Sequence, residues 1–297
     1  PEIIAQVAKL PEELMPPSLG KLWGKRKLFS SLAKVGMKRK GAGAVAQVVE
    51  RDPDLDRLPA LKTWKRDGGP FLTLPLVYTE DPETGIGNLG MYRIQCYGKS
   101  DVGVHIQIHR GGGIHLHVAE QRGDALPVAI HLGGPPALIL SAIAPLPENV
   151  PEVLLGSLVL GQRLRTTTSA HSPLPLMADA EFCLLGEVRP GETRPEGPFG
   201  DHTGFYSLPD RYPVVEVSAV TMREKAVFPA TVVGPPPQED YFLGKATERV
   251  FLPMLKTLIH DIEDYDLQMF GAFHNCAMVR IKKAYPLQAR RVMHAIW

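Results

Sequence analysis

The sequence has 297 residues, of which 44% are hydrophobic and 22% are charged, and its formal net charge at pH 7 is +1. This composition is typical of ordinary soluble globular proteins, and the near-zero charge gives no reason to expect nucleic acid or an acidic partner. At this length we expect two domains, or one domain and a fragment of another. The 28 glycines and 28 prolines indicate many turns and a strand-rich core.

The cysteines and the hydropathy pattern indicate the compartment. Cys96, Cys183 and Cys276 lie far apart in no CxxC motif, which favours thiols in a reducing compartment over a disulfide framework. No apolar run reaches about 18 residues and no signal-peptide pattern is present, so we expect a cytoplasmic protein. Because the sequence starts with Pro1 and stops within a predicted helix, we expect it to be part of a longer protein.

Residues 1 to about 60 have the pattern of helices interrupted by proline and glycine. They contain a basic cluster of Lys21, Lys25, Arg26, Lys27, Lys34, Lys38, Arg39 and Lys40. Such a cluster can attract phosphates. The aromatic residues of a nucleic-acid platform are sparse here, which favours a solvated helix face.

From about residue 68 onward the hydrophobic period changes to two. In "YRIQCYG" (92–98) and "VGVHIQIHR" (102–110) apolar residues alternate with polar ones, which predicts two half-buried strands joined by a hairpin at "GKSD". The polar sides of these strands hold Arg93, His105, Gln107 and His109. Further strands are predicted at 126–132, 137–143, 179–188 and 214–222, which together indicate a mostly antiparallel sheet or barrel.

Helices are predicted on both sides of a proline-rich boundary at about 233–240. "NVPEVLLGSLVLGQRL" predicts a helix with Asn149 as N-cap and Glu152 as the acid of a capping box. After the boundary, "YFLGKATERVFLPMLKTLIH" is helical in pattern, and a strand at "CAMVRIK" and another helix follow. This last part has the pattern of the beginning of a separate α/β domain.

The polar face of the hairpin is either a solvent-exposed surface or the wall of a pocket. The following segment, "GGGIHLHV", adds His115 and His117 to this face. An HxH pair on a strand can ligate zinc, but no third ligand lies at a convincing spacing, so a zinc site is a weak hypothesis. Three glycines directly after Arg110 let the backbone approach a ligand closely, which suits a phosphate.

Two carboxylates lie five positions apart in "PEGPFGDHTGFYS" (195–207). Glu196 and Asp201 are separated by Gly-Pro-Phe-Gly, residues that fix or bend the backbone. A solvated acidic turn would not need that rigidity, whereas acids aimed at a substrate would. The alternative is that Asp201 caps the turn ahead of His202.

Several of these stretches together resemble one protein family. "NLGMYRIQ", "HRGG", "GGPPALILSAIAPLPENVPE", "PEGPFGDHTGFYS" and "GPPPQEDYFLGKATERVFLPMLK" are similar, in this order, to motifs of the UbiD family of decarboxylases. The family acts on aromatic or α,β-unsaturated carboxylic acids with prenylated FMN. The resemblance implies an α+β multidomain fold, with a central split β-barrel that is flavin-reductase-like, mostly antiparallel and flanked by α/β segments. The end of an N-terminal α/β domain would occupy 1–65, the flavin-binding barrel 66–232, and the start of a C-terminal α/β domain 233–297.

The resemblance also implies a site, residue by residue. Arg93, Glu196 and Asp201 would be catalytic, with Asp201 as proton donor and Glu196, paired with Arg93, tuning that acid and orienting the substrate. Mn²⁺, with K⁺ as a candidate second ion, would be held by Asn88, His109 and Glu152, which from the residues alone include a turn residue and a capping acid. The prenylated FMN would be bound by Met91, Tyr92, Arg93, His105, Ile106, Gln107, Arg110 and Gly111.

The function implied is the non-oxidative decarboxylation of an aromatic acid. The leading substrate is a (prenylated) 4-hydroxybenzoate-type quinone precursor, and a menaquinone-pathway naphthoate is the alternative. Two further hypotheses are a non-decarboxylating FMN-binding split-barrel protein and a binding module that uses the basic N-terminal segment. As partners we expect a flavin prenyltransferase that supplies the cofactor, further copies of the chain in a homodimer or larger homo-oligomer, no nucleic acid, and peripheral contact with the inner face of the membrane through a lipophilic substrate.

Overall fold

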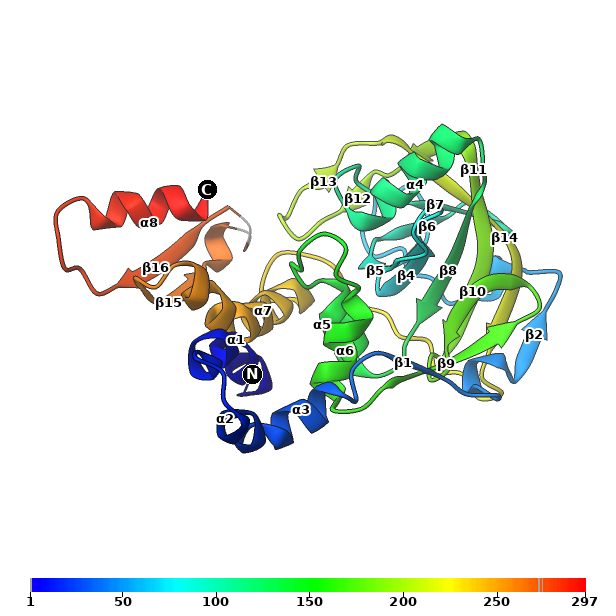
Figure 1. The fold of residues 1–297 in the computed structure, drawn as a ribbon. Helices are drawn as coiled ribbons and strands as arrows, with labels where there is room; N and C mark the ends of the chain where they lie inside the picture. The colour runs from blue at the N-terminus through cyan, green and yellow to red at the C-terminus, as the bar shows by residue number, and fades with distance from the viewer. Residues whose placement is uncertain (1, 272, 274) are drawn as a thin grey trace. The chain divides into compact units, whose positions relative to one another are not determined.

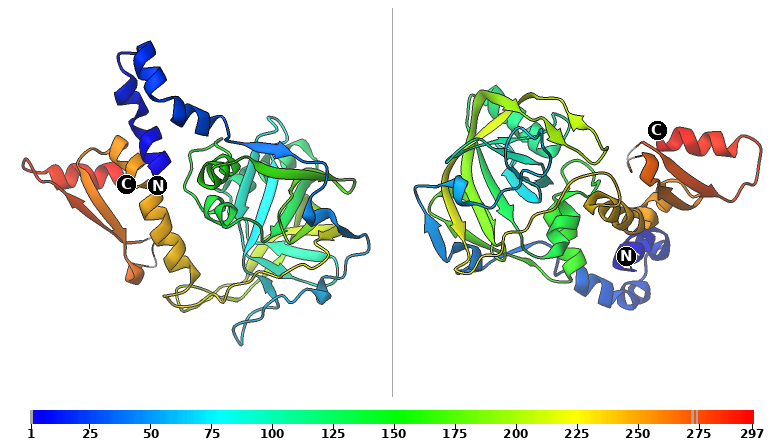
Figure 2. Two further views of the ribbon diagram at one scale, coloured as in Figure 1. Left: turned by 90° about the horizontal axis from the view of Figure 1, so that it is seen from below. Right: turned by 180° about the vertical axis from the view of Figure 1, so that it is seen from behind.

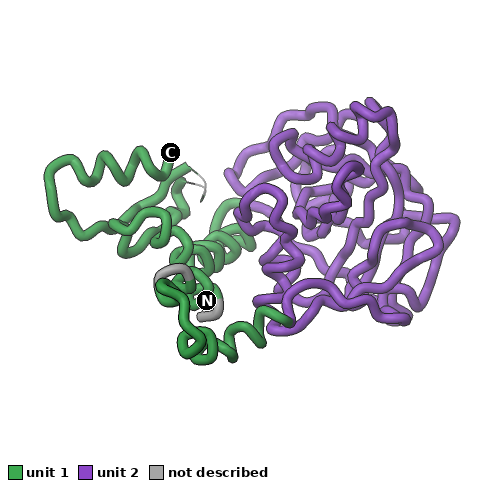
Figure 3. The backbone as a smooth tube through the Cα atoms, in the orientation of Figure 1, with its two compact units in different colours: residues 1–33, 235–297 green, residues 34–234 purple. Residues whose placement is uncertain are grey.

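The computed structural model of the chain describes residues 2–271, 273 and 275–297. These residues form two compact units, one of residues 34–234 and one of residues 1–33 with 235–297 (Figure 3). The domain boundaries expected near residues 65 and 233 remain a prediction about the whole protein. Residues 34–65 lie in the larger compact unit, where β2 (Val48–Glu50) pairs with β14 (Asp210–Met222).

The larger unit is built mainly of strands (Figure 1). Its other strands are β1 (Met37–Arg39), β3 (Phe71–Leu72), β4 (Pro75–Glu80), β5 (Gly87–Met91), β6 (Ile94–Cys96), β7 (Asp101–Val104), β8 (Leu126–Leu132), β9 (Leu164–Ser169), β10 (Ser172–Met177), β11 (Phe182–Glu196), β12 (Phe199–Gly200) and β13 (Tyr206–Ser207). Its helices are the short 3-10 turns η1 (Ala44–Ala46) and η2 (Leu55–Arg57), and α4 (Gly111–Arg122), α5 (Pro136–Ala142) and α6 (Glu152–Leu160).

One large antiparallel sheet organises this unit. Its strand order is β3-β6-β7-β14-β11-β8-β4-β5, with β2 paired to β14 as a ninth strand. Within the described residues no strand pairing closes the sheet into a barrel, so the observed architecture is mixed α+β with an open antiparallel sheet. Two smaller sheets accompany it, β1-β9-β10 and the hairpin β12-β13. Figure 2 shows this unit from two further sides.

The large sheet is apolar on both faces. In β8, Val128, Ile130 and Leu132 pack into one hydrophobic core, while Ala129 between them packs into a second core. Strand β11 divides in the same way, with Leu184 in the first core and Leu185 in the second. Because side chains alternate across a strand, a sheet covered on both sides needs continuous apolar runs. This explains the run at 126–132, where a strand is confirmed.

His131 lies on the same face of β8 as Ala129, and its side chain is fully buried. Its Nε2 accepts a hydrogen bond of 3.1 Å from the backbone N–H of Met177 in β10. Burial lowers the pKa of His131 to about 4. The imidazole is therefore neutral in the folded protein at neutral pH.

This buried imidazole predicts a pH dependence of stability. Between about pH 6.5 and 4 the unfolded chain binds a proton at His131 that the folded chain does not, so stability falls as the pH falls through this window. We expect His131 to contribute about 2 kcal/mol to the loss of unfolding free energy between pH 7 and pH 5. The variant His131→Gln keeps an acceptor for Met177 but cannot titrate, so its loss should be smaller by that amount. Urea unfolding at both pH values measures it, and equal losses in both proteins would contradict it.

Three predictions of secondary structure were wrong. The stretch 137–143 was predicted to be a strand and is helix α5, which begins at Pro136 and lies beside α6 (Figure 1). The alternation at 102–110 was expected to continue to His109, but strand β7 ends at Val104, and Ile108 is 89% exposed. The glycine-rich segment that follows, expected to add His115 and His117 to the same strand face, begins helix α4.

The smaller unit contains helices at both ends of the chain. Its elements are α1 (Glu2–Leu14), α2 (Leu19–Gly24), α3 (Arg26–Leu32), α7 (Glu239–Leu258), β15 (Ile262–Leu267), the 3-10 turn η3 (Met269–Gly271), β16 (Ala277–Ile281) and α8 (Gln288–Ile296). Strands β15 and β16 pair in antiparallel fashion, and α1 packs on α7. The helix, strand and helix expected after the proline-rich boundary are confirmed as α7, β16 and α8. Within the part of the chain that the structure describes, no helix combines the length and apolar character needed to cross a membrane.

Candidate active site

The site starts at the hairpin of β6 and β7. Ile94 lies opposite Val104 in the register, so the next residues outward, Arg93 and His105, are neighbours across the hairpin. The N–H of His105 donates a hydrogen bond of 3.1 Å to the carbonyl of Arg93. The predicted polar face of the hairpin therefore begins with a guanidinium beside an imidazole, and these two side chains are partly buried, whereas Gln107 and His109 farther along are exposed.

Strand β11 brings the first acid to Arg93. Arg93 Nε lies 2.8 Å from Glu196 Oε1 and Nη2 lies 3.1 Å from Oε2, which is a bidentate pair. The Glu196 side chain has no exposed surface. Its Oε2 also lies 3.0 Å from Nδ1 of His105, whose ring stacks on Tyr212.

The hairpin of β12 and β13 brings the second acid to the same arginine. Arg93 Nη1 donates to Asp201 Oδ2 over 3.1 Å. The other oxygen, Oδ1, accepts from the N–H of His202 over 2.7 Å and lies 2.7 Å from Nδ1 of the same residue. Asp201 therefore accepts hydrogen bonds both within its own turn and from Arg93. The structure brings together Arg93, Glu196 and Asp201, the three residues expected to be catalytic.

Both carboxylates are ionised at neutral pH in this arrangement. Burial by itself would raise the pKa of Glu196, but the hydrogen bonds and charges of His105 and Arg93 outweigh it, so the net pKa is below the ordinary value. Burial would likewise raise the pKa of Asp201, and the hydrogen bonds and charge of His202, with the charge of Arg93, lower it. A proton held by Asp201 must therefore be supplied from elsewhere.

Three further residues that sequence reasoning missed position these acids. Asp67 is buried and accepts from the N–H of Gly200 and of Trp64, each over 2.8 Å, so it fixes the backbone next to Asp201. Gln95 accepts from Gly197 N–H over 2.8 Å. Ser207 Oγ accepts from Arg93 Nη2 over 2.9 Å. Gln95 and Ser207 lie within the family-like motifs, whereas Asp67 stands in a separate loop with no sequence signal.

A second group of predicted residues meets where α6 approaches β5. Glu152 Oε2 accepts from the backbone N–H of Leu89 over 2.8 Å, next to Asn88. The predicted N-cap role of Asn149 is wrong, because Asn149 has a φ of 63° and Pro151 is the N-cap of α6. Burial raises the pKa of Glu152, and its hydrogen bonds only partly offset this. A nearby cation would stabilise the ionised form of a buried carboxyl of this kind.

The N-terminus of α4 lies against Asn88. A Cβ on Gly111 would fall 2.0 Å from Asn88 Oδ1, so only glycine permits this approach. The N–H of Gly112 donates to Tyr92 Oη over 3.4 Å, and Arg110 at the N-cap makes no side-chain cap bond. Asn88 Nδ2 is buried and has no hydrogen-bond partner in the described structure. A helix N-terminus without a side-chain cap, beside an arginine and an unsatisfied amide N–H donor, has the chemistry of an anion site.

The remaining predicted site residues differ in how far their side chains are buried. Gln107, His109 and Arg110 are exposed, Met91 is half-buried, and Ile106 is buried in the first core. Within the described ranges, no three His, Cys, Asp or Glu side chains cluster as a metal site. Of the three predicted metal ligands, Glu152 accepts a hydrogen bond from the N–H of Leu89, the residue after Asn88 in β5. His109 lies in the exposed segment before α4.

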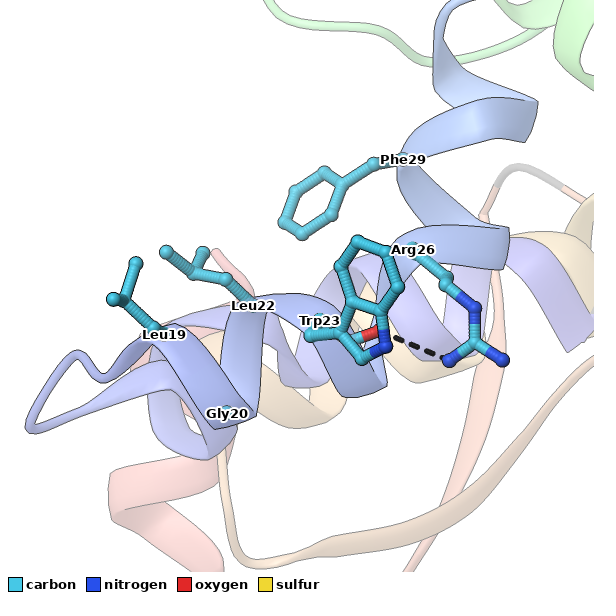
Figure 4. Close-up of a pocket in the computed structure, with 6 residues that line it drawn as sticks. All are labelled: Leu19, Gly20, Leu22, Trp23, Arg26 and Phe29. Atoms are coloured by element: carbon cyan, nitrogen blue, oxygen red, sulfur yellow. Dashed lines mark hydrogen bonds between the residues drawn. The ribbon is translucent and has the colours of Figure 1, made fainter.

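The smaller unit has a pocket on helices α2 and α3. It is lined by Leu19, Gly20, Leu22, Trp23, Arg26 and Phe29 and has a volume of about 670 Å³ (Figure 4). Arg26 is its one charged residue, and it donates to the carbonyl of Trp23 over 3.2 Å. The pocket contains no acid or nucleophile, so it is not the candidate active site.

The fold and site define an α+β protein in which one arginine joins two carboxylates and in which a glycine-rich helix N-terminus lies against Asn88. Residues 37–236 match the sequence model of the UbiD family, described as 3-octaprenyl-4-hydroxybenzoate carboxy-lyase Rift-related domain, and residues 241–297 match that of its C-terminal domain. The chain belongs to the UbiD family.

Relatives from distant organisms support this assignment. A protein of Chlamydia pneumoniae that is named as a subunit of 4-hydroxybenzoate decarboxylase is 42% identical over 283 residues, which are 95% of this chain and 48% of the relative. A protein of Archaeoglobus fulgidus is 46% identical over 261 residues, 88% of this chain and 54% of the relative. The chain thus spans about half the length of these curated relatives.

Solved structures share the fold. The UbiD-class enzyme HmfF from Pelotomaculum thermopropionicum, in an evolved dimeric form in complex with prFMN, is 28% identical with a TM-score of 0.81, over 90% of this chain and 65% of that one. Vanillic acid decarboxylase of Sedimentibacter hydroxybenzoicus, in its closed form, has a TM-score of 0.81 at 24% identity, over 94% of this chain and 60% of that one. The second similarity concerns the fold alone.

Proposed function

We propose that this chain is part of a carboxy-lyase that removes carbon dioxide from an aromatic carboxylic acid with the help of prenylated FMN. The observation that carries the proposal is the contact of one guanidinium, that of Arg93, with both Glu196 and Asp201. Membership of the UbiD family and the similarity to a prFMN-bound UbiD-class enzyme support it. Hydride transfer by an ordinary flavin would not need two converging acids, which makes a redox function a weaker candidate.

The residues present fit the cofactor. The N-terminus of α4 with Arg110 would hold the flavin phosphate, and the oxygens of Asn88 and Glu152 would hold a divalent cation such as Mn²⁺, with the exposed His109 as a further ligand. Tyr92, Met91, Ile106 and Gln107 would line the flavin on the sheet, which in this proposal acts as the wall of a split barrel. When bound, prenylated FMN supplies the electron sink that decarboxylation requires.

The chain's own residues would then orient the substrate and move one proton. Arg93 would offer the substrate carboxylate its positive charge and the second N–H of Nη1, since its other N–H groups donate to Glu196, Asp201 and Ser207. Glu196, fully buried, holds Arg93 in place from the other side. Asp201 would deliver a proton to the carbon from which carbon dioxide has left.

We propose a hydroxybenzoate-type acid, prenylated in a quinone precursor, as the substrate. The name of the Chlamydia pneumoniae relative supports this chemical class. The proposal extends to a homodimer or larger homo-oligomer and to a prenyltransferase that supplies the flavin. It is tested by adding a panel of hydroxybenzoates and hydroxynaphthoates to full-length protein loaded with prenylated FMN and measuring the carbon dioxide released. Release from none of them by a fully loaded protein would refute it.

Glu152 provides a test of cofactor binding that is independent of turnover. We expect Glu152→Ala to lose manganese and flavin together, because its carboxylate would hold the cation on which binding of the flavin phosphate would depend. Glu148→Ala, which alters an exposed acid in the loop before α6, is the matched control and should retain both. Metal analysis by mass spectrometry and the flavin absorption spectrum measure the result. A purely structural Glu152 would instead cost about 1 kcal/mol of stability, with full metal content.

A further inference from the structure

The two acids of the site are each paired with an imidazole. Glu196 lies 3.0 Å from His105 Nδ1, and Asp201 lies 2.7 Å from His202 Nδ1. Arg93 stands between the two pairs and contacts both carboxylates. His105 is among the residues expected to bind the flavin, whereas His202 has no role in the function proposed above.

We propose that His202 is a positioning residue that carries protons from solvent to Asp201. The geometry points to it: Nδ1 is within hydrogen-bond distance of Oδ1, and the His202 side chain is 23% exposed, so the imidazole contacts water as well as the acid. The turn that holds the pair is closed by hydrogen bonds from Asp201 N–H to the Phe205 carbonyl, over 3.1 Å, and from Gly204 N–H to the Asp201 carbonyl, over 3.0 Å.

Such a relay is required by the state of Asp201. The acid must give up one proton in each turnover, yet its pKa lies below the ordinary value because the groups around it favour the carboxylate. Imidazole is the side chain whose charge changes between pH 5 and 8, so it can hold a proton at neutral pH and release it to a neighbour. The proposal rests on the proposed function, because only a proton-consuming reaction needs the resupply.

The proton transfer balances without any oxidant or reductant. The Nδ1–H bond of the imidazolium breaks as the Oδ1–H bond of Asp201 forms. That O–H bond breaks in turn as a C–H bond forms at the substrate carbon, which keeps the electron pair of its former bond to the carboxylate. Neutral His202 then takes a proton from water. Among the contacts given for the described residues, the charged groups next to the pair include Arg93 and, through Arg93, Glu196 with its neighbour His105.

His105 is less suited to this role. Its carboxylate partner, Glu196, is fully buried and accepts hydrogen bonds from Nε and Nη2 of Arg93. The His105 ring is stacked on Tyr212, with centroids 4.0 Å apart. A proton passed from His105 would therefore reach Glu196, the residue that holds the arginine. His202 is the imidazole that contacts the expected donor.

The first test uses full-length protein without cofactor, so it does not depend on the decarboxylase activity. The protonation of the His202 ring is followed by nitrogen-15 NMR across pH 4–9 in the wild type and in Asp201→Asn. Removing a carboxylate 2.7 Å away should lower the titration midpoint of His202 by about one pH unit or more. The ring of His171, in the turn between β9 and β10 of a separate sheet of the same unit, is the internal control and should not shift. An unchanged His202 midpoint would overturn the proposal.

The second test uses the loaded enzyme. His202→Asn retains an N–H donor near the position of Nδ1 but cannot carry a proton, so kcat should fall roughly 10²-fold with KM nearly unchanged. His202→Ala should lose as much and recover part of kcat in imidazole buffer, with a recovery that follows the imidazolium fraction. A full kcat in His202→Asn would overturn the relay. If no aromatic acid is decarboxylated by the wild type, the proposed function fails, and the NMR titration still decides whether the pair is coupled.

Discussion

Turnover should fall by about 10²–10⁴-fold when Asp201 is replaced by Asn, while flavin binding and folding are retained. The amide has the same volume as the carboxyl group and can keep the hydrogen bond from the N–H of His202, but it cannot deliver a proton to carbon. The loss should appear in kcat rather than in KM, because the interaction is used only after the substrate has bound.

The measurement is kcat and melting temperature on the same loaded preparation. Asp210→Asn, which changes an exposed acid opposite Glu196 in the β11–β14 register, is the matched control and should keep its activity. Near-normal activity of Asp201→Asn would mean that Asp201 serves only to cap its turn. Glu196 would then be the next candidate for the proton donor.

Replacing Arg93 with Met should destabilise the protein by about 3–5 kcal/mol, because it leaves the fully buried Glu196 carboxylate without its main counter-charge. Burial penalises the ionised form of Glu196, and the pairing with Arg93 and His105 is what reverses this penalty. The variant should also lose the cation–π contact of the guanidinium with Phe199, whose ring centroid lies 4.7 Å from Cζ. Urea unfolding of the full-length chain measures the change.

Two control variants distinguish the cost of leaving a buried charge unpaired from the cost of lost packing. The double variant Arg93→Met with Glu196→Leu should recover a large part of the loss, since both charges are then removed. Arg165→Met breaks a more exposed pair with Asp179 and should cost less than about 1 kcal/mol. A loss in the Arg93 variant no larger than that of Arg165→Met would show that the pair does not stabilise the site.

The hairpin and the convergence of the acids could be predicted from the sequence for physical reasons. Strict alternation from Tyr92 to Cys96, a short polar turn and a second alternating run are sufficient to specify β6 and β7, and their register fixes Arg93 beside His105. The Gly-Pro-Phe-Gly spacer keeps Glu196 and Asp201 on one arginine. Which arginine they contact followed only from the family resemblance, because residues 93 and 196 are far apart in the chain.

The two helices missed on the sheet show where periodicity is insufficient. The run after Pro136 is apolar on nearly every residue, and a short run of this kind does not distinguish a buried strand from a buried helix. In α4, the buried positions 112, 115, 116 and 119 do have helical spacing, and Gly123 ends the helix with a φ of 72°. The helical spacing was missed in that segment because the helix begins with three consecutive glycines. Asp67 could not be predicted, because its role depends on the tertiary approach of Gly200.

The central claim is that this chain protonates the carbon that loses carbon dioxide, with Arg93, Glu196 and Asp201 around the substrate. The most direct measurement is a decarboxylation by the loaded full-length protein in deuterium oxide, with the product analysed by mass spectrometry and NMR. The account predicts one molecule of carbon dioxide per product and a single deuterium at the carbon that carried the carboxylate. An oxidised product, or a product without deuterium at that carbon, would contradict it.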